Sequence, residues 1–158
     1  MDAENRHQVF DWLWTSGQLS EQDIAELPRM GIRTVVNLAL PTASNALPGE
    51  AEYVASTGMN YFQIPVPWEK PELHHLGLFF SLMEIIQGEN TWVHCALNMR
   101  VSTFMYLYRL LRLNESEEAA SFPLREVWEP NEIWSQFISS ALQAGPRISF
   151  QQNVCNCR

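Results

Sequence analysis

The chain alternates short β-type segments with helical ones, and this alternation limits the folds open to it. Thr34–Leu40 reads TVVNLAL, which is β-branched and nearly all apolar, and Thr91–His94 reads TWVH. Short apolar runs of this kind predict strands that are covered on both faces. Helical segments between such runs predict crossover connections, which join parallel strands. We therefore expect an α/β protein with a mostly parallel central sheet flanked by helices.

Capping residues and helix breakers mark the ends of the predicted elements. Ser20 and Asp23 resemble a capping box, and Gly31 would end the helix that the box opens. Pro48 and Gly58 bound a second helix in the same way. The predicted strands cover residues 9–14, 34–40, 61–66 and 91–94, and the predicted helices cover 20–30, 48–57, 72–87, 100–113, 117–127 and 131–142.

A chain of 158 residues is long enough for one domain with a sizeable core. We expect a single domain over residues 1–144 and a C-terminal tail over 145–158. Of the three cysteines, Cys155 and Cys157 fall in that tail. This number and placement do not form a disulfide framework, so the core should not depend on oxidation.

The charge balance excludes several kinds of partner. Ten basic residues stand against eighteen acidic ones, for a formal net charge of −8. A surface this acidic repels nucleic acid and anionic membranes, so we expect neither as a partner. The longest apolar run, Phe104–Leu113, contains two arginines and is too short to span a bilayer. Polar residues follow Met1, which indicates a cytoplasmic protein, or a periplasmic one if a signal peptide has been removed.

The segment Trp92–Ser102, WVHCALNMRVS, is the most informative about chemistry. A buried strand ends there, a short loop follows and a helix begins, and ligands of open α/β sheets bind at such strand ends. The helix start offers unpaired N–H groups and a positive dipole end, which stabilise a thiolate at Cys95. The Arg100 guanidinium matches two oxygens of a phosphate. A phosphoryl-transfer site is predicted, with anion ligands from Ala96, Leu97, Asn98, Met99 and Arg100.

This segment resembles the signature of the protein tyrosine and dual-specificity phosphatase superfamily, which is His-Cys, five residues, Arg, then Ser or Thr. More closely, the chain is similar to a small bacterial branch, a phosphatase-like domain of unknown function. Trp14–Gln18 (WTSGQ), Gly31–Leu38 (GIRTVVNL) and Val93–Ser102 (VHCALNMRVS) carry the likeness, which extends over roughly residues 10–142. The resemblance implies a dual-specificity-phosphatase-like fold and a cofactor-free hydrolysis of a phosphate monoester through a phosphocysteine.

The resemblance also implies roles for two neighbours of the loop and for its ligands. Ser102 corresponds to the hydroxyl that assists departure of the thiolate, and His94 would orient the loop through backbone contacts. The implied partners are a phosphorylated protein or a small phosphate ester, with phosphate or sulfate able to occupy the loop. Phosphotyrosine, phosphoserine, a nucleotide and a phosphoinositide remain open as substrates.

The loop departs from the superfamily in length. Only four residues separate Cys95 from Arg100, and none of them is the usual glycine. The missing residue removes one amide donor and changes the angle at which Arg100 meets the anion. Four residues is the spacing of the rhodanese active loop, so a rhodanese-like sulfurtransferase stays open. A phosphate-binding pseudophosphatase without turnover is the other alternative.

Ester cleavage also needs a general acid to protonate the leaving oxygen. The superfamily usually places an Asp on a loop in the middle of the chain, but no Asp follows residue 23 here. Glu69 stands in such a loop, beside Trp68 and between two prolines. Glu69 is therefore the predicted acid, with Glu72 as the weaker alternative.

No metal site is predicted. His74 and His75 are adjacent on a predicted helix, where neighbouring side chains are expected to point apart. The Cys155-x-Cys157 pair has no further Cys or His near it in the sequence.

Overall fold

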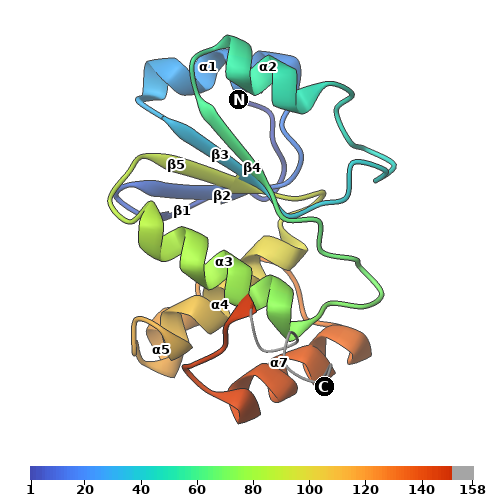
Figure 1. Cartoon of the computed structure of the whole chain (residues 1–158), viewed down its shortest axis with the longest axis vertical. Coiled ribbons are helices and arrows are strands. Elements are labelled where there is room, and N and C mark those ends of the chain that lie inside the picture. The colour runs from blue at the N-terminus through green and yellow to red at the C-terminus, as the bar shows by residue number, and fades with distance from the viewer. Residues whose placement is uncertain (151–158) are drawn as a thin grey trace, which may run out of the picture. The chain divides into compact units, whose positions relative to one another are not determined.

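Five strands form one sheet within residues 1–150, the part of the chain that the computed structural model describes (Figure 1). Strand β1 (His7–Phe10) pairs antiparallel with β2 (Leu13–Ser16). Strands β2, β5 (Thr91–His94), β3 (Thr34–Asn37) and β4 (Asn60–Gln63) run parallel, and the order is β1-β2-β5-β3-β4. The prediction of an α/β protein with a mostly parallel central sheet is confirmed.

The described residues divide into two compact units whose segments alternate along the chain. The first unit consists of Met1–Pro65 and Gly88–Val101 and contains the whole sheet. The second consists of Val66–Gln87 and the residues from Ser102 onward, and it is helical. The single domain over 1–144 and the tail over 145–158 stay a prediction, and Cys155 and Cys157 lie outside the described residues.

Three helical elements belong wholly to the first unit: α1 (Glu21–Glu26), the 3₁₀ helix η1 (Leu27–Met30) and α2 (Glu50–Ser56). The capping box at Ser20 is confirmed, because Ser20 and Asp23 exchange two hydrogen bonds of 3.0 Å. Pro28 explains the change to a 3₁₀ turn, since it has no N–H for an α-helical bond. Gly31 follows with a left-handed φ of 81°, as its predicted place after the helix requires.

Apolar residues of these helices and of the central strands form the core of the first unit. Every residue of β3 and β5 is buried, as expected for central strands of a parallel sheet. The indoles of Trp14 and Trp92 stack with their centroids 5.6 Å apart. The buried members of this core are Leu19, Ile24, Leu27, Ile32, Val35, Val54, Met59 and Trp92.

The second unit is built around aromatic side chains. Its helices are α3 (Leu73–Ile85), α4 (Met99–Leu111, whose first residues belong to the first unit), α5 (Glu117–Ala120), α6 (Leu124–Val127) and α7 (Glu132–Ala144). Phe104 packs on Phe79 at 5.5 Å and on Phe137 at 5.7 Å between ring centroids. Ile148 is fully buried, so the last described residues are part of this packing.

Several predicted elements are wrong in their extent, and the strands predicted over 34–40 and 61–66 end at Asn37 and Gln63. The segment predicted as one strand over 9–14 contains the end of β1, a turn at residues 11–12 and the start of β2. Two residues suffice to connect antiparallel strands, so a hairpin fits within this apolar run and was predicted as one strand. The helix predicted over 117–127 is split into α5 and α6, because Pro123 lacks the N–H that a continuous helix needs.

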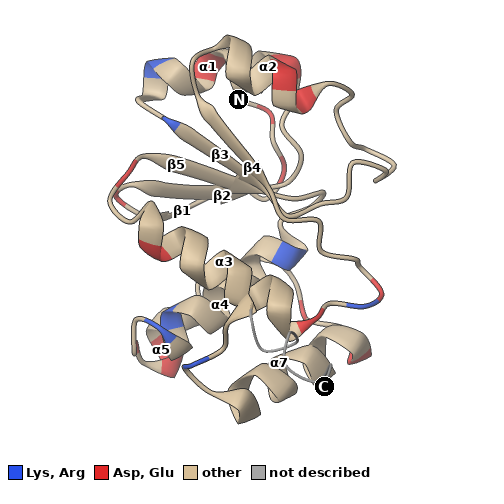
Figure 2. Cartoon of the chain, viewed as in Figure 1, with Lys and Arg blue, Asp and Glu red and all other residues tan. Residues whose placement is uncertain are grey.

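Charges follow the helix dipoles in both units. Acidic residues occupy the first turns of α1, α2 and α5, where the positive dipole end favours them (Figure 2). Helix α4 is different, since its first turn holds Arg100 and no acid. Within residues 1–150 none of the helices combines the length and apolar character that a membrane crossing requires.

Candidate active site

Three parallel strands end at one edge of the sheet, and the candidate site begins there. In the strand register His94 of β5 lies between Ser16 of β2 and Asn37 of β3. Beyond the strand ends, Cys95 N–H donates to the Ser16 carbonyl at 3.3 Å, and Leu38 N–H donates to the His94 carbonyl at 2.9 Å. The sheet thus fixes the position of Cys95, which is buried with 1% of its surface exposed.

The loop after Cys95 is held by its carbonyl groups. The Ala96 carbonyl accepts from Gln18 N–H at 3.0 Å and from Asn45 Nδ2 at 3.1 Å. The Leu97 carbonyl accepts from Asn5 Nδ2 at 2.9 Å. Among residues 1–150 no acceptor is found for the backbone N–H of Ala96 or Leu97. These N–H groups can therefore donate to a ligand.

Asn98 takes the conformational role of the glycine that the loop lacks. Its φ of 65° is left-handed, a region that Asn tolerates better than most residues. The side chain is fully buried and donates to the Asn5 carbonyl at 2.7 Å and to Thr15 Oγ1 at 3.0 Å. A four-residue loop without glycine therefore closes onto α4, which begins at the next residue, Met99.

Gly17 is needed because the loop passes directly over it. A Cβ atom at this position would lie 2.8 Å from the Ala96 carbonyl oxygen and 3.2 Å from Leu97 Cα. Both contacts are with backbone, so no side chain could rotate to relieve them. This close approach gives a physical reason for the glycine in the WTSGQ segment.

We expect Gly17→Ala to displace the loop and to expose Cys95. The measurement is the rate at which iodoacetate alkylates Cys95, followed by peptide mapping, with Cys155 and Cys157 as internal references. Alkylation of Cys95 should be faster in the variant. Gly58→Ala is the control, since a Cβ there meets nothing within 4 Å but is strained by a φ of +85°. It should destabilise the fold by about 1–2 kcal/mol without changing Cys95 alkylation. Equal alkylation in Gly17→Ala and the parent protein would contradict this account of Gly17.

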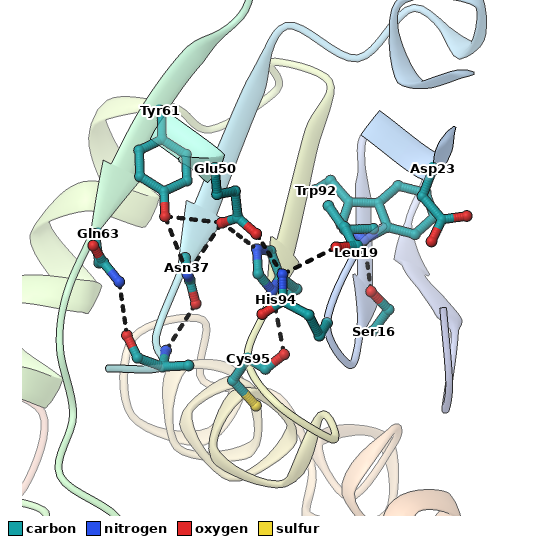
Figure 3. Close-up of polar contacts among 12 residues, drawn as sticks. Ser16, Leu19, Asp23, Asn37, Glu50, Tyr61, Gln63, Trp92, His94 and Cys95 are labelled. Carbon is teal, nitrogen blue, oxygen red and sulfur yellow. Dashed lines mark hydrogen bonds and ion pairs between the residues drawn. The ribbon is translucent and has the colours of Figure 1, made fainter. Parts of the chain in front are cut away.

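His94 connects the loop to a buried carboxylate (Figure 3). The ring is fully buried, with Nδ1 3.2 Å from the Cys95 carbonyl oxygen and Nε2 3.0 Å from Glu50 Oε2. Both nitrogens face oxygen acceptors, so the imidazolium form, which donates from both, satisfies both contacts. The predicted role of His94 in orienting the loop stays a prediction, and these contacts are its physical basis.

Glu50, on the first turn of α2, is the centre of this network. Tyr61 Oη donates to Oε2 at 2.8 Å, Asn37 Nδ2 donates to Oε2 at 3.1 Å, and Gln18 Nε2 donates to Oε1 (Figure 3). Burial on its own would raise the pKa of Glu50, but the hydrogen bond and charge of His94 and the other donors hold that pKa below its ordinary value. Burial raises the pKa of Tyr61, and so does the nearby carboxylate, so the phenol remains a donor.

Sequence reasoning missed this network. A glutamate in the first turn of a helix is usually solvated and favoured by the dipole, so Glu50 carries no sequence signal of its own. Asn37 offers one, because it is the only polar residue among the apolar ones that follow Thr34 in TVVNLAL. A polar residue inside a buried strand needs a hydrogen-bond partner, and Glu50 supplies it.

We expect Glu50→Gln to remove a pH-dependent part of the stability. The folded pKa of Glu50 is lowered from an ordinary value of about 4.5. Its stabilisation is therefore complete above that value and is lost as the pH falls through the folded pKa. Urea unfolding near pH 7 should show the variant less stable by about 1–3 kcal/mol, and the gap should narrow below pH 4.5. Exposed Glu52, changed to Gln, is the control and should show neither effect. A gap that is constant with pH would contradict the assignment.

The other predicted site residues fall in both units. Arg100 lies in the first turn of α4, belongs to the first unit with Cys95, and is buried with 6% exposed. Arg100 is thus a buried cation at the positive end of a helix dipole, a position at which an anion is favoured. Ser102 is fully buried and Glu69 is exposed, and both belong to the second unit.

The expectation that His74 and His75 point apart is wrong. Their ring centroids lie 4.0 Å from each other. Both residues stand in the first turn of α3, and His74 Nδ1 lies 3.0 Å from Glu72 Oε2. At a helix start few neighbours restrict the side chains, so adjacent rings can turn to the same side.

Solved structures of protein tyrosine/dual-specificity-type phosphatases share the fold of this chain, in agreement with the sequence resemblance. A candidate phosphatase (DUF442) from Shewanella putrefaciens CN-32 is similar over 91% of this chain and 95% of its own, at 28% identity and a TM-score of 0.80. Tk-PTP in its active form is similar over 90% and 96%, at 18% identity and a TM-score of 0.70. TpbA from P. aeruginosa, in complex with phosphotyrosine, is similar over 92% and 84%, at 16% identity and a TM-score of 0.62. No protein-family model and no curated protein sequence matches the chain.

Proposed function

We propose that the chain is a cysteine-dependent phosphatase that hydrolyses a phosphate monoester through a phosphocysteine intermediate. The observation that carries the proposal is the loop after Cys95, whose carbonyls are bonded outside it while the N–H groups of Ala96 and Leu97 have no acceptor within residues 1–150. Arg100, buried in the first turn of the next helix, supplies the guanidinium. Similarity to solved phosphatases supports the same reaction class.

The proposed reaction has two steps. The Cys95 thiolate attacks phosphorus, an S–P bond forms and the P–O bond to the leaving group breaks, while the leaving oxygen takes a proton from a general acid. Water then attacks phosphorus and gives a proton to the carboxylate left by the first step, the S–P bond breaks, and the Cys95 thiolate and phosphate are released. The loop N–H groups and Arg100 stabilise the charge on the phosphoryl oxygens in both steps. Ser102 would assist departure of the thiolate, and the shortened loop, with one donor fewer, implies slow turnover.

Glu69 is the proposed acid, and its surroundings support this choice over Glu72. The carbonyl of the preceding residue, Trp68, accepts from Trp134 Nε1 at 2.9 Å, and the two indoles pack at 5.5 Å between centroids. Glu69 is therefore an exposed carboxyl next to an anchored residue. Glu72 is instead engaged by Lys70 at 3.5 Å and by His74 at 3.0 Å.

The first test of the proposal is hydrolysis of an aryl phosphate, since TpbA is the structural relative in complex with phosphotyrosine. Cys95→Ser should abolish hydrolysis because it removes the nucleophile. Arg100→Lys should lower kcat/KM by about 10²–10³-fold, since an ammonium cannot bind two phosphoryl oxygens as a fork. Cys157→Ser is the control and should keep full activity.

Three results would contradict the proposal. Full activity of Cys95→Ser would exclude the covalent mechanism. Faster turnover of thiosulfate and cyanide than of any phosphate ester would favour the rhodanese-like reaction. Phosphate binding without hydrolysis of any ester would favour the alternative of a phosphate-binding pseudophosphatase.

The assignment of Glu69 makes a separate prediction about leaving groups. Glu69→Gln should slow hydrolysis of an alkyl or unactivated phenyl phosphate by about 10²–10⁴-fold, the usual contribution of general acid catalysis. It should change nitrophenyl phosphate hydrolysis much less, because nitrophenolate departs without a proton. Glu72→Gln is the matched control and should leave the ratio of the two rates unchanged. If Glu72→Gln alters this ratio and Glu69→Gln does not, the two roles are reversed.

A further inference from the structure

Three potential metal ligands lie together at the start of α3. Glu72 is the N-cap residue of this helix, but its side chain makes no capping hydrogen bond. His74 and His75 follow in the first turn, with their rings 4.0 Å apart between centroids. One ligand atom from each of the three residues lies within 4.8 Å of the other two. All three belong to the second unit.

His75 provides a second, independent observation. Its Nδ1 atom is shielded from solvent and has no hydrogen-bond partner among residues 1–150. A buried polar atom without a partner costs about 1–3 kcal/mol, and nearly all such atoms in folded proteins are satisfied.

We propose that Glu72, His74 and His75 bind one divalent transition-metal ion, with Zn²⁺ as the preferred ion. Two imidazoles and a carboxylate are a ligand set that Zn²⁺ takes in proteins, with a fourth position left to water. At Zn–ligand distances near 2.0–2.1 Å, tetrahedral ligand atoms stand roughly 3.3 Å apart. The three side chains are only partly buried, so rotation about their side-chain bonds can close the remaining distance.

The ion would replace the contact between His74 Nδ1 and Glu72 Oε2 at 3.0 Å and one exposed ion pair. Glu72 Oε1 now lies 3.5 Å from Lys70 Nζ, and the Lys70 side chain is 81% exposed. An ion pair this exposed contributes little to stability, so a metal can take its carboxylate at small cost. The site uses none of Cys95, Arg100, Ser102 and Glu69, and the binding test below does not depend on activity.

Titration of the full-length protein with Co²⁺, and competition by Zn²⁺, tests the proposal. We expect one ion per chain and visible d–d bands without a thiolate-to-cobalt charge-transfer band, since no cysteine is a ligand. His74→Gln, His75→Gln and Glu72→Gln should each weaken binding by about tenfold or more, at least the loss that second-shell changes cause. His7→Gln is the control and should leave the affinity unchanged.

A measurement on the unaltered chain tests the same site without requiring that the variants fold. Zn²⁺ should shift the ring nitrogen signals of His74 and His75 in NMR spectra and leave those of His7 and His94 in place. The proposal is overturned if a charge-transfer band appears while the histidine variants bind normally, because the ion then sits on cysteine. It is also overturned if Zn²⁺ shifts neither His74 nor His75.

Discussion

The candidate site depends on one buried carboxylate. Glu50 accepts hydrogen bonds from four side chains, each contributed by a different one of the four parallel strands or by the residues just after it: Gln18, Asn37, Tyr61 and His94. Burying a carboxylate costs several kcal/mol unless donors replace its water, and these four do so. The anchored carboxylate thereby connects β2, β3, β4 and β5 to one another. The loop that follows β5 starts from this fixed edge.

Hydrogen bonds from residues outside the loop hold its carbonyl groups. The carbonyls of Cys95, Ala96 and Leu97 each have a hydrogen-bonding partner outside the loop. A carbonyl that turned inward would bring a negative dipole end toward a bound anion, so holding the carbonyls outward makes the loop able to accept one. Asn98 completes this arrangement with its left-handed φ of 65°, and it does so in a loop one residue shorter than the superfamily usually has. The shorter loop is therefore held by a full set of carbonyl hydrogen bonds despite the missing residue.

The sequence was informative where the signal is local and uninformative where distant residues meet. Thr91–His94 and the start of α4 lie within a residue of their predicted positions, because apolar runs and helix starts are short-range patterns. The hairpin hidden in residues 9–14 was missed because its turn carries no glycine or proline. Glu50 was missed for a different reason. Its burial is created by residues 11 to 44 positions away, and no pattern around position 50 records them.

An acidic chain must bind an anion by local geometry, because its long-range field opposes the approach of one. The net charge of −8 does not steer an anion toward the site. Glu50, in contact with His94 just before Cys95, adds a further negative charge. The contact with His94 limits this cost. His94 Nε2 lies 3.0 Å from Glu50 Oε2, and Nδ1 lies 3.2 Å from the Cys95 carbonyl oxygen. Arg100 is then the one basic side chain assigned to the anion, and at 6% exposure its charge is little screened by salt. Anion binding at this site then rests on the loop N–H groups and on Arg100, while the contact between Glu50 and His94 supports the start of the loop at the Cys95 carbonyl.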